Sequence, residues 1–137
     1  MIRVEQVGRP EWDKLAQNAH LISFGEIRPP EFNRFHYALV CLDDAEIYSY
    51  ATIVEMDQES AYMQHGGAMP NIKGTVSVLK CYRLVMDWLR LRYKRISTRI
   101  SNQNLPMLKM AMHEGLRIIG CDLYPDGVFL HLNLEVL

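Results

Sequence analysis

The hydrophobic and polar positions of the chain follow two different periods. Alternating apolar and polar residues indicate a half-buried strand, whereas apolar residues spaced by three and four indicate an amphipathic helix. Strands are predicted for MIRVEQV, FHYALVCL, EIYSYATIVEM, AYMQHGGAM, RISTRI, LRIIGCDLY and VFLHLNLEVL. Helices are predicted for residues 9–22, 75–93 and 105–114. Strands and helices therefore alternate through the middle of the chain, and the last two strands form a hairpin.

The segment 75–93 is the most regular of these helices. Its side chains Val78, Tyr82, Val85 and Leu89 fall on one face, and charged residues fall on the opposite face. At ~1.5 Å per residue this helix is about 28 Å long. The sequence predicts an α/β (α+β) fold with a mixed, largely antiparallel central sheet flanked by helices. With 137 residues and no linker or repeat, the chain 1–137 forms one domain.

The charges are unevenly distributed along the chain. Residues 1–72 hold eleven acids and five bases, while residues 73–99 hold eight bases against Asp87 alone. This basic stretch is explained by a solvated helix face, by an anion site beside the preceding loop, or by a nucleic-acid surface. The sequence pI of about 6.5 lies below the usual value for a nucleic-acid-binding module, which disfavours the third explanation.

The cysteines, histidines and apolar runs exclude several other classes of protein. Cys41, Cys81 and Cys121 are widely spaced and odd in number, which argues against a disulfide framework. We therefore expect buried free thiols, a reducing compartment and a cytoplasmic location. The five histidines show no metal-ligand spacing, so no metal is expected. No apolar run approaches the ~20 residues of a membrane span, and no secretory signal is visible.

A short loop, Lys73-Gly74-Thr75, leads directly into the long helix. The first N–H groups of a helix lack intrahelical partners and carry the positive end of its dipole, so they bind phosphate-like anions. Gly74 allows a turn and a close ligand approach, Thr75 and Ser77 supply hydroxyls, and Lys73 supplies charge. The loop is not a Walker A motif. On spacing alone, an ordinary strand-to-helix turn is the better explanation of this loop.

The order of elements resembles the GNAT superfamily of N-acetyltransferases. The segment 70–78, PNIKGTVSV, resembles the family stretch Pro-x-x-Arg/Gln-Gly-x-Gly-x-Gly/Ala, and Asn104 with Gly115-Leu116 resembles its later stretch. The resemblance implies acetyl-CoA as the cofactor and acetyl transfer to an amine of a small molecule or protein. It implies main-chain contacts of the pantetheine arm with Gly67, Ala68 and Met69, and a contact with Asn104. It also implies that the pyrophosphate is held by Lys73, Gly74, Thr75, Val76, Ser77 and Val78.

The sequence departs from this family pattern in two places. Val76 and Val78 stand where the family prefers small residues, and Lys73 replaces a planar donor, so the pyrophosphate loop is degenerate. Ala111 stands at the position of the family's tyrosine acid. His113 or Tyr124 would have to replace that tyrosine, although neither is matched by the motif.

The predicted general base lies beside the paired glycines 66–67, which suggest a bulge or a close backbone approach. His65 is the first choice because imidazole titrates near neutrality. The alternatives are a structural role for His65, a water relay, or the carboxylates of Glu55, Asp57 and Glu59. Phe24, Glu26, Arg28 and Phe32 form either a wall of the acceptor site or a plain connector.

Two other functions remain open from the sequence. One is a catalytically silent GNAT-like module that binds CoA or a protein partner, which the degenerate loop and Ala111 favour. The other is a nucleic-acid-binding domain that uses residues 73–99. The sequence is also compatible with a homodimer.

Overall fold

The computed structural model describes residues 1–8 and 35–137. Within these ranges seven strands form one sheet, in the order β1-β2-β3-β4-β5-β7-β6. In chain order the elements are β1 (Ile2–Val7), β2 (Tyr37–Asp43), β3 (Glu46–Asp57), β4 (Ser60–Ala68), α2 (Val76–Arg90), β5 (Arg95–Ser101), α3 (Leu105–His113), β6 (Arg117–Tyr124) and β7 (Gly127–Glu135). The predicted helix 9–22, the loop after it and the four acceptor-site side chains proposed there lie outside the described residues.

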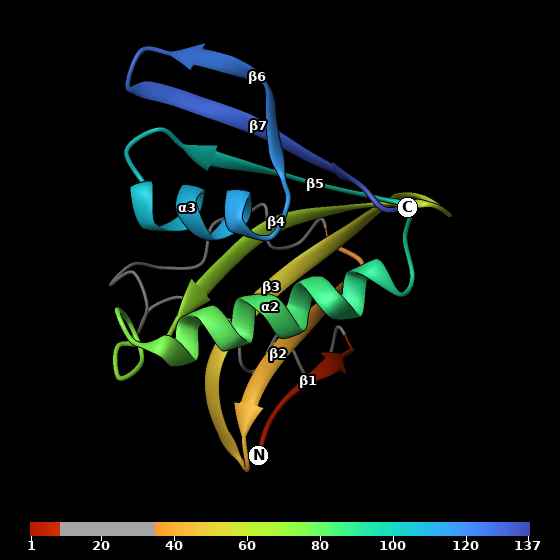
Figure 1. The fold of residues 1–137 in the computed structure, drawn as a ribbon, viewed down its shortest axis with the longest axis vertical. Coiled ribbons are helices and arrows are strands. Elements are labelled where there is room, and N and C mark those ends of the chain that lie inside the picture. Colours follow the sequence, from red (N-terminus) through yellow and green to blue (C-terminus); the bar gives the residue numbers. More distant parts are fainter. Residues whose placement is uncertain (9–34) are drawn as a thin grey trace.

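All neighbouring strands pair antiparallel except β4 and β5, which are parallel. Antiparallel strands can be joined by tight hairpins, and the β2–β3 hairpin turns through Asp44 at a φ of 55°. The parallel pair needs a crossover, which α2 supplies. Figure 1 shows α2 and α3 on the same face of the sheet. The predicted mixed, largely antiparallel sheet with flanking helices is confirmed.

The main core lies between the sheet and the two helices. Helix α2 contributes Val85, Met86 and Leu89, and α3 contributes Leu108 and Ala111. These side chains are buried because the apolar stripe of each helix faces the sheet. A second buried cluster, on the opposite face, contains Val7, Phe35, Ala38, Val40, Tyr50 and Met69. The main core therefore fills the space between the sheet and the two helices with packed side chains.

Helix α2 ends at Arg90, earlier than the predicted end at residue 93. The main-chain N–H groups of Arg92 and Tyr93 both donate to the carbonyl of Leu89, which tightens the last turn. This turn brings the Tyr93 ring into the core, where its hydroxyl contacts the hydroxyl of Tyr37. Packing of one aromatic side chain thus overrides the local helical pattern.

The prediction of free thiols at Cys41 and Cys81 is wrong. The two residues form a disulfide between β2 and α2, with their Cα atoms 5.8 Å apart. Cys121 is the free cysteine, and it is exposed rather than buried. The packing of α2 on β2 brings together residues 40 positions apart, which spacing alone does not reveal. Because disulfides are rare in reducing compartments, the cysteines give no support to a cytoplasmic location.

Candidate active site

The sheet opens between β4 and β5. Their parallel register covers four residue pairs, from Ser60↔Arg95 to Met63↔Thr98, and ends there. Beyond this point β4 continues to Ala68 and β5 continues to Ser101, and Figure 1 shows the two strands diverging toward the end where both helices begin. We call this space the β4–β5 opening. Past Met63 and Thr98 the register of the two strands ends.

A bulge in β4 lies at the start of the opening. Ile53 pairs with Met63 and Thr52 pairs with His65, so Gln64 is the extra residue. The bulge therefore precedes the two glycines by two residues. The paired glycines were also expected to allow a close approach of another backbone. Gly66 does so, because a Cβ atom there would lie 3.1 Å from the Tyr50 carbonyl oxygen.

The pairing of β4 with β3 decides which main-chain groups face the opening. The Met69 N–H donates to the Tyr48 carbonyl at 2.8 Å, and its own carbonyl accepts from residues 72 and 73. Bonded pairs alternate in an antiparallel ladder, so Gly67 also directs its main-chain groups toward β3. Gly66 and Ala68 direct theirs toward the opening. Of residues 67–69, which the family resemblance implies, only Ala68 directs its main chain toward the opening, and Gly66, which does so too, is one that the sequence reasoning missed.

The loop before α2 has a conformation that requires glycine. Gly74 adopts a φ of 78°, in the left-handed region that side chains disfavour. The Thr75 hydroxyl donates to the Ile72 carbonyl at 2.6 Å and does not cap the helix. The first turn of α2 carries no acidic residue, so no carboxylate of that turn offsets the positive end of the helix dipole.

The side chains of residues 73–78 are exposed or half-buried. Val76 is 65% exposed and is directed to solvent rather than into the core, while Ser77 and Val78 are half-buried. Lys73 is exposed. At the other side of the opening, Asn104 caps α3 by accepting from the Met107 N–H at 3.4 Å. The two helix N-termini therefore flank the same end of the opening (Figure 1).

The predicted base His65 lies on the outer face of the sheet, opposite α2 and α3. Ile53 and Met63 are buried in the main core under α2, so the next pair, Thr52 and His65, faces the other way. The His65 N–H donates to the Thr52 hydroxyl at 3.1 Å. His65 therefore stands next to the bulge, and its role as a base stays a prediction.

The carboxylates proposed as alternative bases lie elsewhere. Glu55 accepts a hydrogen bond from the Tyr93 hydroxyl at 2.9 Å, near the closed end of the β4–β5 pair. Asp57 accepts from the Glu59 N–H in the β3–β4 turn, and Glu59 pairs with Lys94. None of the three reaches the bulge. They act in packing and surface charge.

The two replacements considered for the missing tyrosine are also separated. Ala111 is fully buried in the main core, and His113 lines a shallow pocket between α2 and α3 with Tyr82 and Arg83. That pocket is on the helix face. Tyr124 lies on the outer face instead, where its hydroxyl accepts from Arg99 at 2.8 Å.

Sequence reasoning missed a polar cluster on the outer face of β5, β7 and β6. Asp122 lies 2.7 Å from the His131 Nε2 and 3.6 Å from an Arg99 terminal nitrogen. The Arg99 guanidinium also lies 5.2 Å from the ring of Phe129 and 5.6 Å from that of Tyr124. Strand alternation indicates these positions one by one, but the cluster requires knowledge that β7 lies between β5 and β6.

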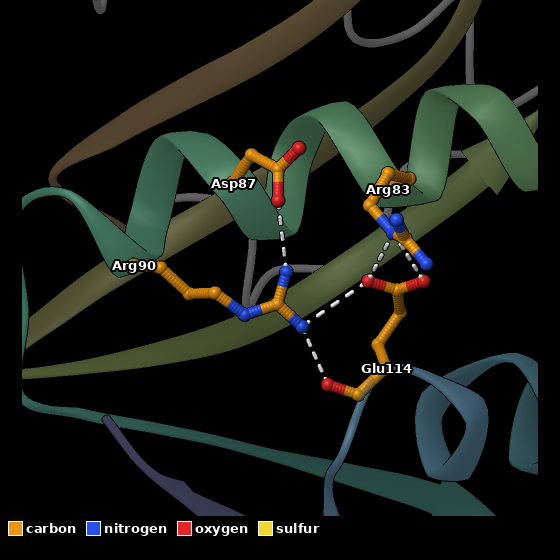
Figure 2. A network of polar contacts seen from close by, with 4 residues as sticks. All are labelled: Arg83, Asp87, Arg90 and Glu114. Atoms are coloured by element: carbon orange, nitrogen blue, oxygen red, sulfur yellow. Dashed lines mark hydrogen bonds and ion pairs between the residues drawn. The ribbon is translucent and has the colours of Figure 1, made fainter. Parts of the chain in front are cut away.

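The basic stretch is largely neutralised by ion pairs. Figure 2 shows Arg83 and Arg90 of α2 directed at Glu114, which follows α3. The Arg83 Nε lies 2.8 Å from both carboxylate oxygens, and Arg90 reaches a carboxylate oxygen at 3.1 Å. Arg90 also pairs with Asp87 at 2.9 Å. These arginines therefore join the two helices and do not form an open anion site.

Neither a metal site nor a membrane-spanning helix is found within residues 1–8 and 35–137. No group of three or more His, Cys, Asp or Glu side chains there is arranged to hold a metal ion. Among the same residues, no helix has the length and apolar character needed to cross a bilayer.

Comparison with solved structures shows the fold to which this site belongs. Escherichia coli ribosomal-protein-S18-alanine N-acetyltransferase matches with a TM-score of 0.79 and 11% identity, over 99% of this chain and 94% of that chain. The IAA acetyltransferase from Bacillus cereus ATCC 14579 matches with a TM-score of 0.78 and 11% identity, over 98% and 99%. A GNAT family acetyltransferase from Elizabethkingia anophelis with acetyl-CoA bound matches with a TM-score of 0.74 and 11% identity, over 98% and 97%.

No protein-family profile and no curated protein sequence matches the chain significantly. The chain therefore has the fold of the GNAT acetyltransferases, as predicted from the order of its elements. A fold by itself does not specify a reaction.

Proposed function

We propose that this protein transfers an acetyl group from acetyl-CoA to an amine of a small molecule or protein. The observation that carries the proposal is the β4–β5 opening, which starts at a bulge and ends beside the uncapped N-terminus of α2. An extended arm and an anionic group fit these two places respectively. The similar structure with acetyl-CoA bound supports the same choice of ligand.

The cofactor residues follow from the local geometry. The pyrophosphate would be held by the main-chain N–H groups of Lys73–Val78, where Gly74 provides the turn and Lys73 the charge. The pantetheine arm would pair with the main chain of Gly66 and Ala68, while Gly67 and Met69 shape the strand from its β3 side. Asn104 would flank the arm from the start of α3.

The acceptor reaches the opening from the outer face, since packed side chains fill the helix face. Bound acetyl-CoA supplies the acetyl group: a C–N bond forms to the amine, the C–S bond breaks, and the departing thiolate gains a proton. A main-chain N–H of β4 that faces the opening polarises the carbonyl oxygen. His65 accepts the proton that the amine loses.

A matched pair of variants tests the cofactor claim. Acetyl-CoA should raise the melting temperature, because a ligand that binds only the folded state stabilises it by mass action. Asn and Asp both tolerate a positive φ, so Gly74→Asn and Gly74→Asp differ mainly in charge. We expect Gly74→Asn to keep part of the shift and Gly74→Asp to lose it. Absence of any shift in the parent protein at millimolar acetyl-CoA would remove the cofactor from the proposal.

A second pair tests the base. His65→Gln should lower the rate by about 10²-fold or more and flatten its rise with pH near neutrality, while acetyl-CoA binding persists. His113→Gln is the control, since His113 lies on the helix face. If His65→Gln keeps full activity and the same pH profile, the proton leaves by another route, and a water relay becomes the best explanation.

One observation favours a second function, a catalytically silent CoA-binding or protein-interaction module. No hydroxyl stands at the buried position of Ala111. That function predicts a thermal shift with acetyl-CoA but no acetylation of any amine. Nucleic-acid binding has less support because Lys94 pairs with Glu59 and Arg95 pairs with Glu135, in addition to the pairs at Glu114.

A further inference from the structure

Arg99 occupies the point at which β4 and β5 separate. It follows Thr98, the last residue of β5 that pairs with β4. Thr98 and Ile100 are buried on the helix face, so the Arg99 side chain lies on the outer face, where it is 32% exposed. This is the same face as His65. An acceptor amine that enters the opening from this side therefore passes Arg99.

The positive charge of Arg99 is poorly compensated. The carboxylate nearest to it, Asp122, lies 3.6 Å away and makes a closer contact of 2.7 Å with His131. The hydroxyl of Tyr124 accepts from one terminal nitrogen, and the Tyr62 side chain also interacts with Arg99, but neither tyrosine carries a charge. Within residues 1–8 and 35–137 the buried Nε of Arg99 has no hydrogen-bond partner. Arg83, by contrast, directs its Nε at both oxygens of one carboxylate.

An arginine in this state is suited to binding an anion. A buried N–H without a partner is destabilising by about 1–3 kcal/mol, so natural proteins keep few of them outside functional sites. The guanidinium fork matches a carboxylate through two parallel hydrogen bonds, often by way of Nε. The rings of Phe129 and Tyr124 lie beside the fork and limit its motion.

We propose that Arg99 binds a carboxylate carried by the amine acceptor and thereby sets its specificity. The acceptor class is then an amine with a nearby carboxylate, either a free amino acid or a peptide whose acidic group lies close to its amino group. This inference rests on the proposed acetyl transfer. His131 holds the Asp122 carboxylate and so reduces its repulsion of the incoming anion.

The experiment compares acceptors that differ only in the carboxylate. One pair is an amino acid and its carboxamide, and the other is a short peptide with an acidic or an amidated second residue. The ratio of kcat/KM for acid over amide is measured for the parent protein and for each variant, which cancels the intrinsic reactivity of the amine. Arg99→Gln should lower this ratio by about 10-fold or more, as expected for a charged hydrogen bond. Arg99→Lys should give an intermediate ratio, because it keeps charge without the fork.

Arg95→Gln is the matched control. Arg95 lies on the same face of the same strand, paired with Glu135 at the closed end of β5, so its loss should leave the ratio unchanged. The thermal shift with acetyl-CoA should be equal in all variants. If the ratio depends on Arg99 only for the amino acid and its carboxamide, the carboxylate comes from a free amino acid. If it depends on Arg99 only for the two peptides, the carboxylate comes from a peptide.

Three results would overturn the proposal. If the parent acetylates amines and Arg99→Gln keeps the ratio, the specificity claim fails and the acetyl transfer stands. If Arg99→Gln loses acid and amide acceptors equally, Arg99 supports the sheet and does not read the acceptor. If the parent binds acetyl-CoA and acetylates none of these amines, both the transfer and the specificity claim are rejected.

Discussion

Replacement of Glu114 by glutamine tests whether the α2–α3 network stabilises the fold. The Glu114 side chain is 5% exposed and contacts Arg83 and Arg90, which lie two turns apart on α2 (Figure 2). Gln has nearly the same shape but no charge. It also places an NH₂ group against guanidinium donors, so one of the two accepting oxygens is lost.

The magnitude follows from the exposure of the two partners. Removing one member of a buried ion pair costs about 3–5 kcal/mol when the other charge stays buried. The Arg83 side chain is 54% exposed and is hydrated by water when its partner is lost, so it adds little to the loss of stability. Arg90 is 27% exposed but retains Asp87 at 2.9 Å. The remaining loss is about one to two charged hydrogen bonds, and we expect Glu114→Gln to lower the free energy of unfolding by about 2 kcal/mol.

Urea unfolding with the disulfide intact measures this free energy through the transition midpoint. For 137 residues, 2 kcal/mol corresponds to a fall in Tm of about 6–8 °C. Glu59→Gln is the control, because its pair with Lys94 is solvent-exposed and should contribute less than about 1 kcal/mol. A Glu114→Gln protein as stable as the Glu59→Gln control would show that the network is electrostatically neutral for folding and would refute the reasoning.

Three other perturbations have defined outcomes. The Cys41–Cys81 disulfide closes a loop of 40 residues, so its reduction should destabilise the protein by about 4 kcal/mol in the chain-entropy account. Urea unfolding midpoints with and without dithiothreitol measure this loss, and equal midpoints would contradict it. Gly66→Ala places a Cβ atom 3.1 Å from the Tyr50 carbonyl oxygen and should lower the free energy of unfolding by about 1 kcal/mol or more. Gly120→Ala is the control, because its Cβ would meet nothing within 4 Å, and it should lower this free energy less. A Tm of Gly66→Ala as high as that of Gly120→Ala would contradict this expectation. Burial raises the pKa of Tyr50 above its ordinary value, so the folded state holds that proton more tightly than the unfolded chain does. The resulting stability is complete below pH ~10 and is lost as the pH rises further, and tyrosinate absorbance should appear together with unfolding.

The regular elements were predictable because their signals are local. The alternation in β7 and the helical spacing in α2 each lie within one segment, and Gly115 ends α3 at a φ of 100° as its position predicts. The end of α2 was not predictable, since it depends on the contact of Tyr93 with the distant Tyr37.

The candidate site also contains residues that local sequence predicts and residues that it does not. The loop at Gly74 and the histidine at the bulge are visible in the sequence, because each depends on neighbours within a few residues. Arg99 is different. Its importance arises from the end of the β4–β5 register and from Asp122 on a strand that is not its sheet neighbour. The pairing of Cys41 with Cys81 is equally non-local, and an odd cysteine count pointed away from it.

The shortness of the β4–β5 ladder has a consequence for motion. Four residue pairs join the two arms of the sheet, so we expect each arm to open to solvent at its own free energy. Hydrogen exchange should therefore show two classes of protected amides, one in β2 and β3 and the other in β5 and β7. The disulfide lies wholly within the first arm and its helix, and its reduction should accelerate exchange there first. A ligand lying between the arms would contact both and slow both classes together.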